Sequence, residues 1–366
     1  MVVPTIHPVQ LIQPDGQRVH NPAYSASVAD IGPAQLRDLY RDLVVVRRLD
    51  AEATALQRQG ELGLWAPMTG QEAAQVGSAR ALDADDYVFT SYREHAVAWC
   101  RGVDPADMTA LWRGCAHSGW NPADVNMTNP AIVVGAQGLH ATGYAMGAKL
   151  DGADIATIVY FGDGATSEGD LSEALGFAVG WGAGVVFFCQ NNHWAISAPT
   201  QVQSPVPLAQ RAAGFGMPAV QVDGNDVLAV LAVTRQAARH AREGSGPFFV
   251  EALTYRMGPH TTSDDPGRYR APADLEAWKA RDPVDRLRRL LERESLVDAA
   301  FFDDVDSAAG DEAMRLRRGT LELPDPHPLT MFDHVYATEH SLLAQERAEY
   351  AGYLASFTDT DEEAVR

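Results

Sequence analysis

Two short polar motifs, Gly162-Asp163-Gly164 and Asn191-Asn192, combine residue types that can bind a cation together with an anion. One carboxylate and one amide oxygen suit Mg²⁺, which takes few protein ligands and completes its octahedron with phosphate and water. The two glycines let the backbone approach phosphate oxygens closely. The motifs therefore indicate a site for a magnesium-bound diphosphate, provided that the fold brings them together.

Each of these motifs directly follows a predicted buried strand. Ile155 to Phe161 and Val185 to Gln190 are apolar runs of strand length, and Glu168 to about Trp181 is the predicted helix between them. A right-handed crossover makes the two strands parallel, so their carboxyl ends meet at the ligand-binding edge of the sheet. The N–H groups of the helix would face the diphosphate. An Asp-Gly pair alone is typical of a tight turn, but the strand contexts favour a ligand site.

The same alternation of strands and helices continues along the chain. A strand at 219–222, a helix at 227–243 and a strand at 247–253 follow the first unit, and Tyr87 to Phe89 is a further short strand. We therefore predict an α/β fold, with a parallel sheet flanked by helices on both faces. A GxxxxGK[ST] loop is missing from the sequence, and no GxGxxG run opens a helix after the first strand. A nucleotide triphosphatase or a nicotinamide dehydrogenase thus has little support.

The sequence as a whole predicts that the chain has three parts: an N-terminal arm, the α/β domain and a C-terminal helical region. Residues 1–30 are rich in Pro and Gly and read as an extended arm on a surface or on a partner. Apolar residues at three- and four-residue spacing after Pro33 predict a long helix toward Gln59. The α/β domain should span 31–275, with a charged helical region, 276–366, packed on the same domain and ending in an acidic, solvated tail.

The composition argues against several classes of partner. A net charge of −20 and a pI near 4.8 disfavour nucleic acid, which requires clustered Lys and Arg. The three cysteines are far apart, so neither a disulfide framework nor a zinc site is expected, and a cytoplasmic setting fits. The N-terminus lacks the pattern of an export or transit signal. Apolar runs fall short of the roughly 20 residues that span a bilayer, so we expect no membrane segment.

Four further motifs stand in order around the first two: GELGLWAPMTGQEA, YRE at 92–94, VVGAQGLHATGYAMGAKL and YRMGPHTTSDDPGRYR. Together with GDG, the 26 residues 165–190 and NN, they resemble the alpha subunits of pyruvate and branched-chain 2-oxo acid dehydrogenases from about residue 30 to 280. The resemblance implies a thiamine-diphosphate-binding fold. It also implies an enzyme that decarboxylates a 2-oxo acid and passes the acyl group to the lipoyl domain of a dihydrolipoyl acyltransferase.

The resemblance also assigns the cation and diphosphate contacts. It implies that Asp163, Asn192 and the backbone carbonyl of Trp194 bind Mg²⁺. Family members commonly have Tyr or Phe where this chain has Trp194, but a main-chain oxygen is unaffected by that change. Tyr92 and Arg93 match the pair that holds the diphosphate, for which a planar bidentate donor is well suited. Without the resemblance, a lone Arg would indicate a surface salt bridge.

Two more residues match positions close to the reacting part of the cofactor. Val134 matches the apolar residue that bends thiamine diphosphate, although its residue type is equally typical of ordinary core. His260 matches a loop histidine that assists acyl transfer, and imidazole can transfer protons at neutral pH. The predicted catalytic residue is therefore His260, and the predicted cofactor-binding residues are Tyr92, Arg93, Val134, Gly162, Asp163, Gly164, Ala165, Asn192 and His260.

The family's activating glutamate belongs to a separate beta subunit. The resemblance thus implies an active site at an alpha–beta interface in an α2β2 heterotetramer. Branched-chain substrates are favoured by the TTSDD stretch, with pyruvate as the alternative. A non-catalytic assembly or regulatory subunit is a third hypothesis, against which the intact motifs argue. A complete single-chain thiamine enzyme would need a second cofactor-binding domain. Thr261 and Ser263 stand where some relatives are phosphorylated, but such a loop can also be merely flexible.

Overall fold

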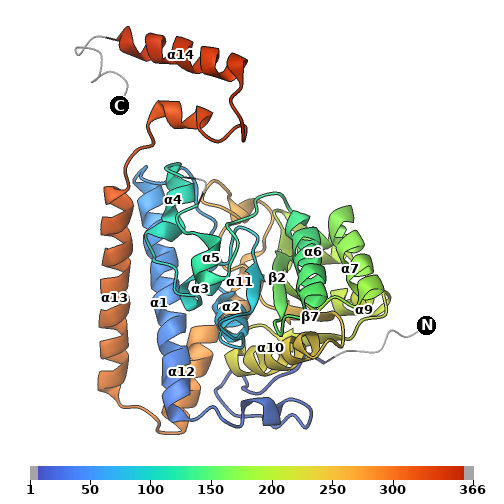
Figure 1. Ribbon diagram of the computed structural model, residues 1–366. Coiled ribbons are helices and arrows are strands. Elements are labelled where there is room, and N and C mark those ends of the chain that lie inside the picture. Colours follow the sequence, from blue (N-terminus) through green and yellow to red (C-terminus); the bar gives the residue numbers. More distant parts are fainter. Residues whose placement is uncertain (1–6, 117, 358–366) are drawn as a thin grey trace. The chain divides into compact units, whose positions relative to one another are not determined.

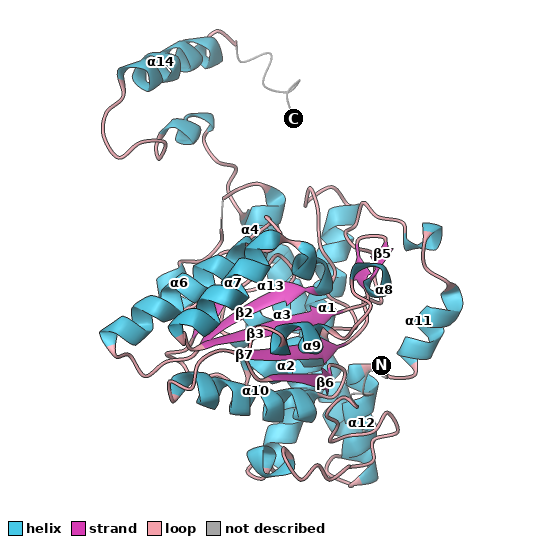
Figure 2. Ribbon diagram, turned by 90° about the vertical axis from the view of Figure 1, so that its right-hand side faces the viewer, coloured by secondary structure: helices cyan, strands magenta, loops and turns pink. Residues whose placement is uncertain are grey.

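The computed structural model of the chain describes residues 7–116 and 118–357. Its centre is a five-stranded parallel sheet in the order β1-β2-β3-β7-β6 (Figure 2). Each predicted strand is confirmed to within two residues at either end. The strands are β1 (Tyr87–Phe89), β2 (Thr157–Gly162), β3 (Val185–Asn191), β6 (Ala219–Asp223) and β7 (Phe248–Leu253).

Helices cover both faces of this sheet, as predicted (Figure 2). Alternate strand residues point to opposite faces. On β2, Ile158 and Tyr160 pack with α10, α2 and α1, whereas Val159 and Phe161 pack with α6 and α7. These helices are α1 (Pro33–Arg58), α2 (Glu72–Ala79), α6 (Ala136–Asp151), α7 (Gly169–Trp181) and α10 (Val227–Arg242).

The described residues form further helices and strands besides these. They are η1 (Ser25–Val28), α3 (His95–Cys100), α4 (Asp107–Arg113), α5 (Pro122–Val125), η2 (Asp163–Ser167), β4 (Trp194–Ala195), β5 (Ala198–Pro199), α8 (Thr200–Gln203), α9 (Leu208–Ala213), η3 (Pro266–Arg268), α11 (Pro272–Lys279), α12 (Pro283–Arg293), α13 (Ala299–Glu322), η4 (Pro328–Phe332) and α14 (Ser341–Ala355). The helical turn directly after β2 is thus the 3₁₀ helix η2, and the α-helix α7 begins at Gly169.

The first described residues of the N-terminal arm, around Val9, lie along the edge of the sheet of their own chain. Val9 pairs in parallel with Val222 of β6; its N–H donates to the Gln221 carbonyl, and its carbonyl accepts from the Asp223 N–H, both at 2.9 Å. Leu11 and Ile12 are buried. This pairing covers an otherwise exposed strand edge.

The chain forms two compact units, which divide after Glu322. The first unit contains the sheet and includes α11, α12 and α13, and α13 packs beside α1 (Figure 1). The second unit contains η4 and α14. The predicted helical region 276–366 is therefore divided between two units instead of forming a single region of one domain. The acidic end of that region, 358–366, lies outside the described residues.

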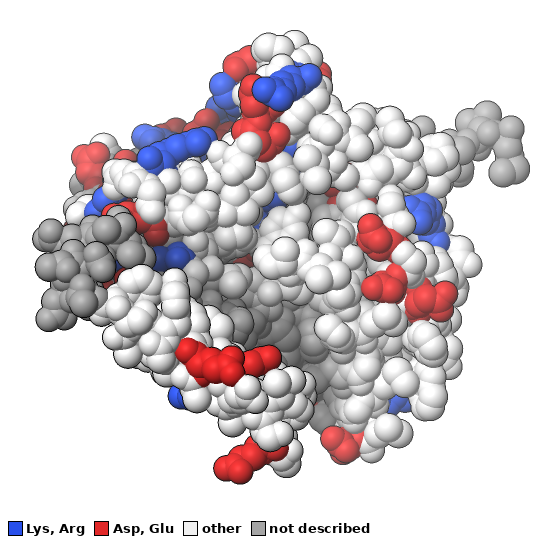
Figure 3. Space-filling view, turned by 90° about the horizontal axis from the view of Figure 1, so that it is seen from above, with Lys and Arg blue, Asp and Glu red and all other residues white. Residues whose placement is uncertain are grey.

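Two observations bear on the predictions about membranes and nucleic acid. Within residues 7–116 and 118–357, no helix combines the length and apolar character needed to cross a membrane. On the face drawn in Figure 3, most of the surface is uncharged, and the Lys and Arg side chains are scattered and interspersed with Asp and Glu, without gathering into one basic patch.

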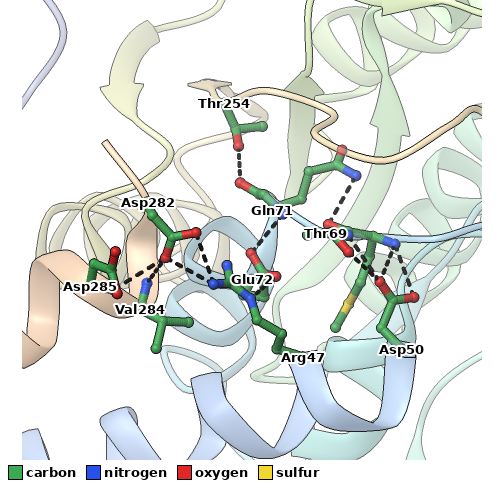
Figure 4. A network of polar contacts seen from close by, with 11 residues as sticks. Arg47, Asp50, Thr69, Gln71, Glu72, Thr254, Asp282, Val284 and Asp285 are labelled. Carbon is green, nitrogen blue, oxygen red and sulfur yellow. Dashed lines mark hydrogen bonds and ion pairs between the residues drawn. The ribbon is translucent and has the colours of Figure 1, made fainter. Parts of the chain in front are cut away.

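A buried carboxylate holds the loop between α1 and α2. Asp50 of α1 is 2% exposed and accepts a hydrogen bond from the Trp65 indole at 2.8 Å. It also accepts from the backbone N–H groups of Met68 and Thr69 and from the Thr69 hydroxyl (2.8 Å) (Figure 4). Burial raises the pKa of the Asp50 carboxyl, whereas these donors lower it. The loop is thus fixed to the helix by a side chain, not by regular secondary structure.

A second buried carboxylate holds the start of α2. Glu72 accepts from the Arg47 guanidinium at 2.9 Å and from the Gly70 N–H at 2.9 Å, and Arg47 also pairs with Asp282 at 2.8 Å (Figure 4). The loop from 65 to 71 is therefore held at both ends.

We expect Asp50→Ala to lower the free energy of unfolding by about 3 kcal/mol, because four donors of the loop lose their buried acceptor. Chemical denaturation measures this change. Asp38→Ala on the same helix is the control: its carboxylate is 67% exposed and pairs with Arg41, so the loss should be about 0.5 kcal/mol or less. Equal losses in the two variants would contradict a specific role for Asp50.

Candidate functional site

A cavity of 460 Å³ lies at the carboxyl ends of β2 and β3. The parallel register pairs Gly162 with Gln190, so the polar motifs that follow the two strands begin at the same level of the sheet. The cavity gathers side chains or backbone from all the sequence-predicted site residues. These are Tyr92, Arg93, Val134, Gly162, Asp163, Gly164, Ala165, Asn192, Trp194 and His260.

Asp163 is the carboxylate at the floor of the cavity. It is 1% exposed, and its Oδ2 accepts hydrogen bonds from the Thr200 hydroxyl (2.7 Å) and the Gln203 amide (3.1 Å). Burial raises the pKa of the Asp163 carboxyl, and the bond from Thr200 opposes that shift. Since both donors occupy Oδ2, Oδ1 is the oxygen that a cation could use, and a cation there would favour the ionised form.

Asn192 and Trp194 follow β3 and are separated by a sharp backbone turn at His193. His193 between them has φ +70°, in the left-handed region. The Trp194 N–H donates to Asn192 Oδ1 at 3.2 Å, and the Trp194 carbonyl accepts from Arg256 at 3.0 Å. In the part of the chain that the structure describes, no three His, Cys, Asp or Glu side chains are grouped to hold a metal. A Mg²⁺ site here would instead use one carboxylate, one amide oxygen and one carbonyl.

The two glycines beside Asp163 have different roles in the structure. A Cβ on Gly162 would project into open space, with nothing within 4 Å. A Cβ on Gly164 would lie 2.8 Å from the Cβ of Ala195. Gly162 therefore leaves room that a ligand can occupy, whereas Gly164 permits close packing against the β4 strand. The residue types alone did not separate these two functions.

Arg93 supplies a positive charge within the cavity. Its side chain is buried, and it donates to the Pro67 carbonyl at 2.5 Å and to the His260 carbonyl at 2.8 Å. The guanidinium carbon lies 5.5 Å from the centre of the Tyr92 ring. Both bonds go to neutral carbonyl oxygens, so the charge of Arg93 is available to an anion such as a diphosphate.

His260 is flanked by two guanidinium groups. Its Nδ1 lies 3.2 Å from Arg93 and 3.5 Å from Arg256. Guanidinium nitrogens can only donate, so Nδ1 must accept and Nε2 carries the proton. Burial, followed by the charges of Arg93 and Arg256, lowers the pKa of His260 to about 4, and Asp264 opposes this shift. The imidazole is therefore neutral at physiological pH.

The loop that carries His260 is held by a ring of hydrogen bonds. Asp264 accepts from the His260 N–H at 2.7 Å and from the Tyr269 hydroxyl at 2.5 Å. The Tyr269 hydroxyl in turn accepts from Arg256 at 2.8 Å. Arg256 thus connects this loop to the Trp194 carbonyl at the opposite wall.

The rim of the cavity is apolar and exposed. Val134 is 42% exposed, and its neighbours Ile132 and Ile196 are 55% and 57% exposed. Val134 is therefore a lining residue of the cavity and not an ordinary core residue. Exposed apolar side chains around a binding cavity are typical of a surface that another molecule covers.

Sequence reasoning missed several lining residues. Gln71 has no assigned role within the GELGLWAPMTGQEA motif, but its side chain lines the cavity and accepts from Asn192 at 3.0 Å. Gln190 is the penultimate residue of β3 and donates to the buried Glu94 at 2.7 Å. Arg256 is 1% exposed. The signal that could have identified Arg256 is its place in the YRMGPH motif, and for Gln71 it is its place in GELGLWAPMTGQEA; Gln190 has no comparable signal.

Known proteins show a consistent similarity to this chain. A family model described as "Dehydrogenase E1 component" matches residues 40–314. The "3-methyl-2-oxobutanoate dehydrogenase subunit alpha" of Mycobacterium tuberculosis is 42% identical over 351 residues, covering 96% of this chain and 95% of the relative. The "Pyruvate dehydrogenase E1 component subunit alpha" of Staphylococcus epidermidis is 39% identical over 290 residues, covering 79% and 77%.

A cavity at the carboxyl edge of a parallel sheet is typical of α/β enzymes that bind a cofactor there. The chain belongs to the dehydrogenase E1 component family, as an alpha subunit of the thiamine-diphosphate-dependent 2-oxo acid dehydrogenases. The resemblance seen in its motifs is thereby confirmed.

We expect the imidazole of His260 to stay neutral down to about pH 4 in the protein without ligands. Because the pKa is lowered on folding, its stabilising contribution is complete above the unfolded value of about 6.5 and is lost as the pH falls. Histidine Cε1–H NMR titration, with His260→Gln for assignment, measures the pKa. Arg256→Met should raise it, whereas Arg268→Met, at an exposed position of the same loop, should not. An unshifted pKa in Arg256→Met would contradict the role of that guanidinium.

Proposed function

We propose that this chain is the alpha subunit of a branched-chain 2-oxo acid dehydrogenase and that the cavity holds thiamine diphosphate through Mg²⁺. The convergence of all ten predicted residues on one cavity carries this proposal. The oxygen donors and the guanidinium lie in the same cavity, as a magnesium-bound diphosphate requires.

The role proposed for each residue of the cavity follows from the chemistry of its side chain or carbonyl group. Asp163, Asn192 and the Trp194 carbonyl would hold the cation, and Arg93 with Tyr92 would hold the diphosphate beside the open space at Gly162. When bound, thiamine diphosphate supplies the stabilisation of negative charge that loss of carbon dioxide from a 2-oxo acid requires. Val134 and Ala165 would shape the wall against which it lies.

His260 would act with its Nε2–H group. Because Nδ1 accepts from Arg93 and Arg256, the proton on Nε2 is the one that can be donated to a reacting oxygen or sulfur. The neutral form suits this role, since a charged imidazolium would add a third cation to the same wall. We propose that the proton moves from Nε2 during acyl transfer to the lipoyl group of a dihydrolipoyl acyltransferase.

The apolar part of the cavity supports a branched substrate. Leu64, Trp112 and Ile132 line it together with Val134 and Ile196. An acid with a branched aliphatic side chain buries more apolar surface there than pyruvate does. The Mycobacterium tuberculosis relative, whose name specifies 3-methyl-2-oxobutanoate, favours the same substrate class. Pyruvate is the second candidate, because the Staphylococcus epidermidis relative is named for it.

A beta subunit would complete the site. The exposed rim of Ile132, Val134 and Ile196 is suited to burial against a partner chain. We propose an α2β2 heterotetramer whose beta subunit contributes the activating glutamate. The cysteines Cys100, Cys115 and Cys189 are free, which supports a reducing, cytoplasmic setting.

We expect Asp163→Ala to abolish magnesium-dependent binding of thiamine diphosphate and to reduce decarboxylation at least about a hundredfold, because the one carboxylate ligand is lost. Calorimetry on the chain co-expressed with its beta subunit, followed by an assay with an artificial electron acceptor, measures both. Asp170→Ala, at an exposed position on the first turn of α7, should retain both properties. A folded wild-type complex that binds no cofactor would support the non-catalytic alternative instead.

We expect kcat/KM for 3-methyl-2-oxobutanoate to exceed that for pyruvate by about tenfold, because two additional carbon atoms are buried at about 0.8 kcal/mol each. Leu64→Ala should narrow this ratio by weakening contact with the branched end of the substrate. Steady-state kinetics with both acids tests the assignment. A higher kcat/KM for pyruvate would identify the chain as a pyruvate dehydrogenase alpha subunit.

A further inference from the structure

The amide of Asn192 has a defined orientation within a short chain of hydrogen bonds. The Gln71 amide N–H donates toward the Met68 carbonyl at 3.5 Å, the Asn192 amide N–H donates to Gln71 Oε1 at 3.0 Å, and the Trp194 N–H donates to Asn192 Oδ1 at 3.2 Å. A backbone carbonyl can only accept, and a backbone N–H can only donate. The two ends of the chain therefore dictate which atom of each amide is nitrogen and which is oxygen.

The stronger of the two constraints on Asn192 comes from Gln71, because it determines where the NH₂ group goes. Gln71 is 1% exposed and Asn192 is 6% exposed, so water cannot readily replace this partner. With its nitrogen committed to Gln71, Asn192 presents Oδ1 on its other side, where a second lone pair remains after the bond from Trp194.

The backbone on both sides of Gln71 is held rigidly. Gly70 has φ +98°, and a Cβ at this position would lie 2.2 Å from the Tyr255 carbonyl, so no other residue fits. The Gly70 carbonyl accepts from Thr254 at 2.6 Å, and its N–H donates to Glu72 at 2.9 Å. Figure 4 shows Gln71 within this network, between Thr254 and Thr69. The side chain of Gln71 thus starts from a fixed point.

From this geometry we infer that Gln71 is a positioning residue, which orients the Asn192 amide so that its oxygen faces the cation. Gln71 would not touch the metal itself. This inference rests on the proposed cation site, and it assigns a function to a side chain whose sequence context indicates only the start of a helix. An amide that presented its NH₂ group would repel the cation, so the orientation contributes to affinity.

The test is cation affinity and not turnover. Binding of Mn²⁺ to the full chain, purified with its beta subunit and in the presence of thiamine diphosphate, is followed by the electron paramagnetic resonance signal of the free ion. We expect Gln71→Met, which has a similar shape but no acceptor, to weaken Mn²⁺ binding about three- to tenfold, as expected for the loss of one buried hydrogen bond. Gln71→Glu retains an acceptor for the Asn192 NH₂ group, so its affinity should not fall.

The same substitution made in an Asn192→Asp variant distinguishes a loss of amide orientation from general damage to the site. In Asn192→Asp both side-chain atoms are oxygens, so the orientation no longer matters, and adding Gln71→Met should change Mn²⁺ affinity by less than about twofold. Equal affinity of Gln71→Met and wild type, or the same loss in both backgrounds, would overturn the inference while leaving the cation site in place. A folded wild-type complex that binds no Mn²⁺ would overturn the proposed function and the inference together.

Discussion

The polar groups of the cavity depend on the parallel register between β2 and β3. Gly162 is paired with Gln190, so Asp163 and Asn192 leave the sheet at nearly the same level and on the same edge. A shift by one residue would turn every side chain of a strand to the opposite face. The apolar residues on both faces of β2 and β3 resist such a shift, since each face is buried under helices. The core of the protein thus maintains the distance between two residues that belong to its site.

The loops around the cavity are held by carboxylates, two of them buried, more than by regular secondary structure. Asp50 and Glu72 hold the segment that contains Pro67 and Gln71, and Asp264 holds the segment that contains His260. Each carboxylate accepts at least one backbone N–H together with a side-chain donor, and for the buried Asp50 and Glu72 these bonds compensate for the cost of burial. This arrangement pairs the N–H groups of Met68, Thr69, Gly70 and His260, which lie in irregular backbone beside the cavity. It also holds the side chains of the candidate site in better defined positions than a mobile loop could.

The charges in the cavity have a consistent distribution. Arg93 and Arg256 are the guanidinium groups beside His260, and burial together with their charges lowers the pKa of the imidazole and keeps it neutral. Asp163 is a single carboxylate whose burial disfavours its ionised form. An anionic diphosphate together with a divalent cation would match both features, because the anion faces the guanidinium and the cation faces the carboxylate. The chain as a whole carries a net charge of −20, so this local positive charge reflects tertiary structure and not composition.

The sequence by itself determined the fold class, the strands that border the cavity and the ten candidate residues that line it. Apolar runs of strand length record burial directly, and the GDG and NN motifs sit at the strand ends where parallel sheets bind ligands. Only the tertiary structure decided that Gly162 faces open space whereas Gly164 packs against Ala195, and that Gln71 and Arg256 contact Asn192 and His260. It also showed that the chain divides after Glu322. These features arise from contacts between residues distant in sequence, which local pattern and residue type do not encode.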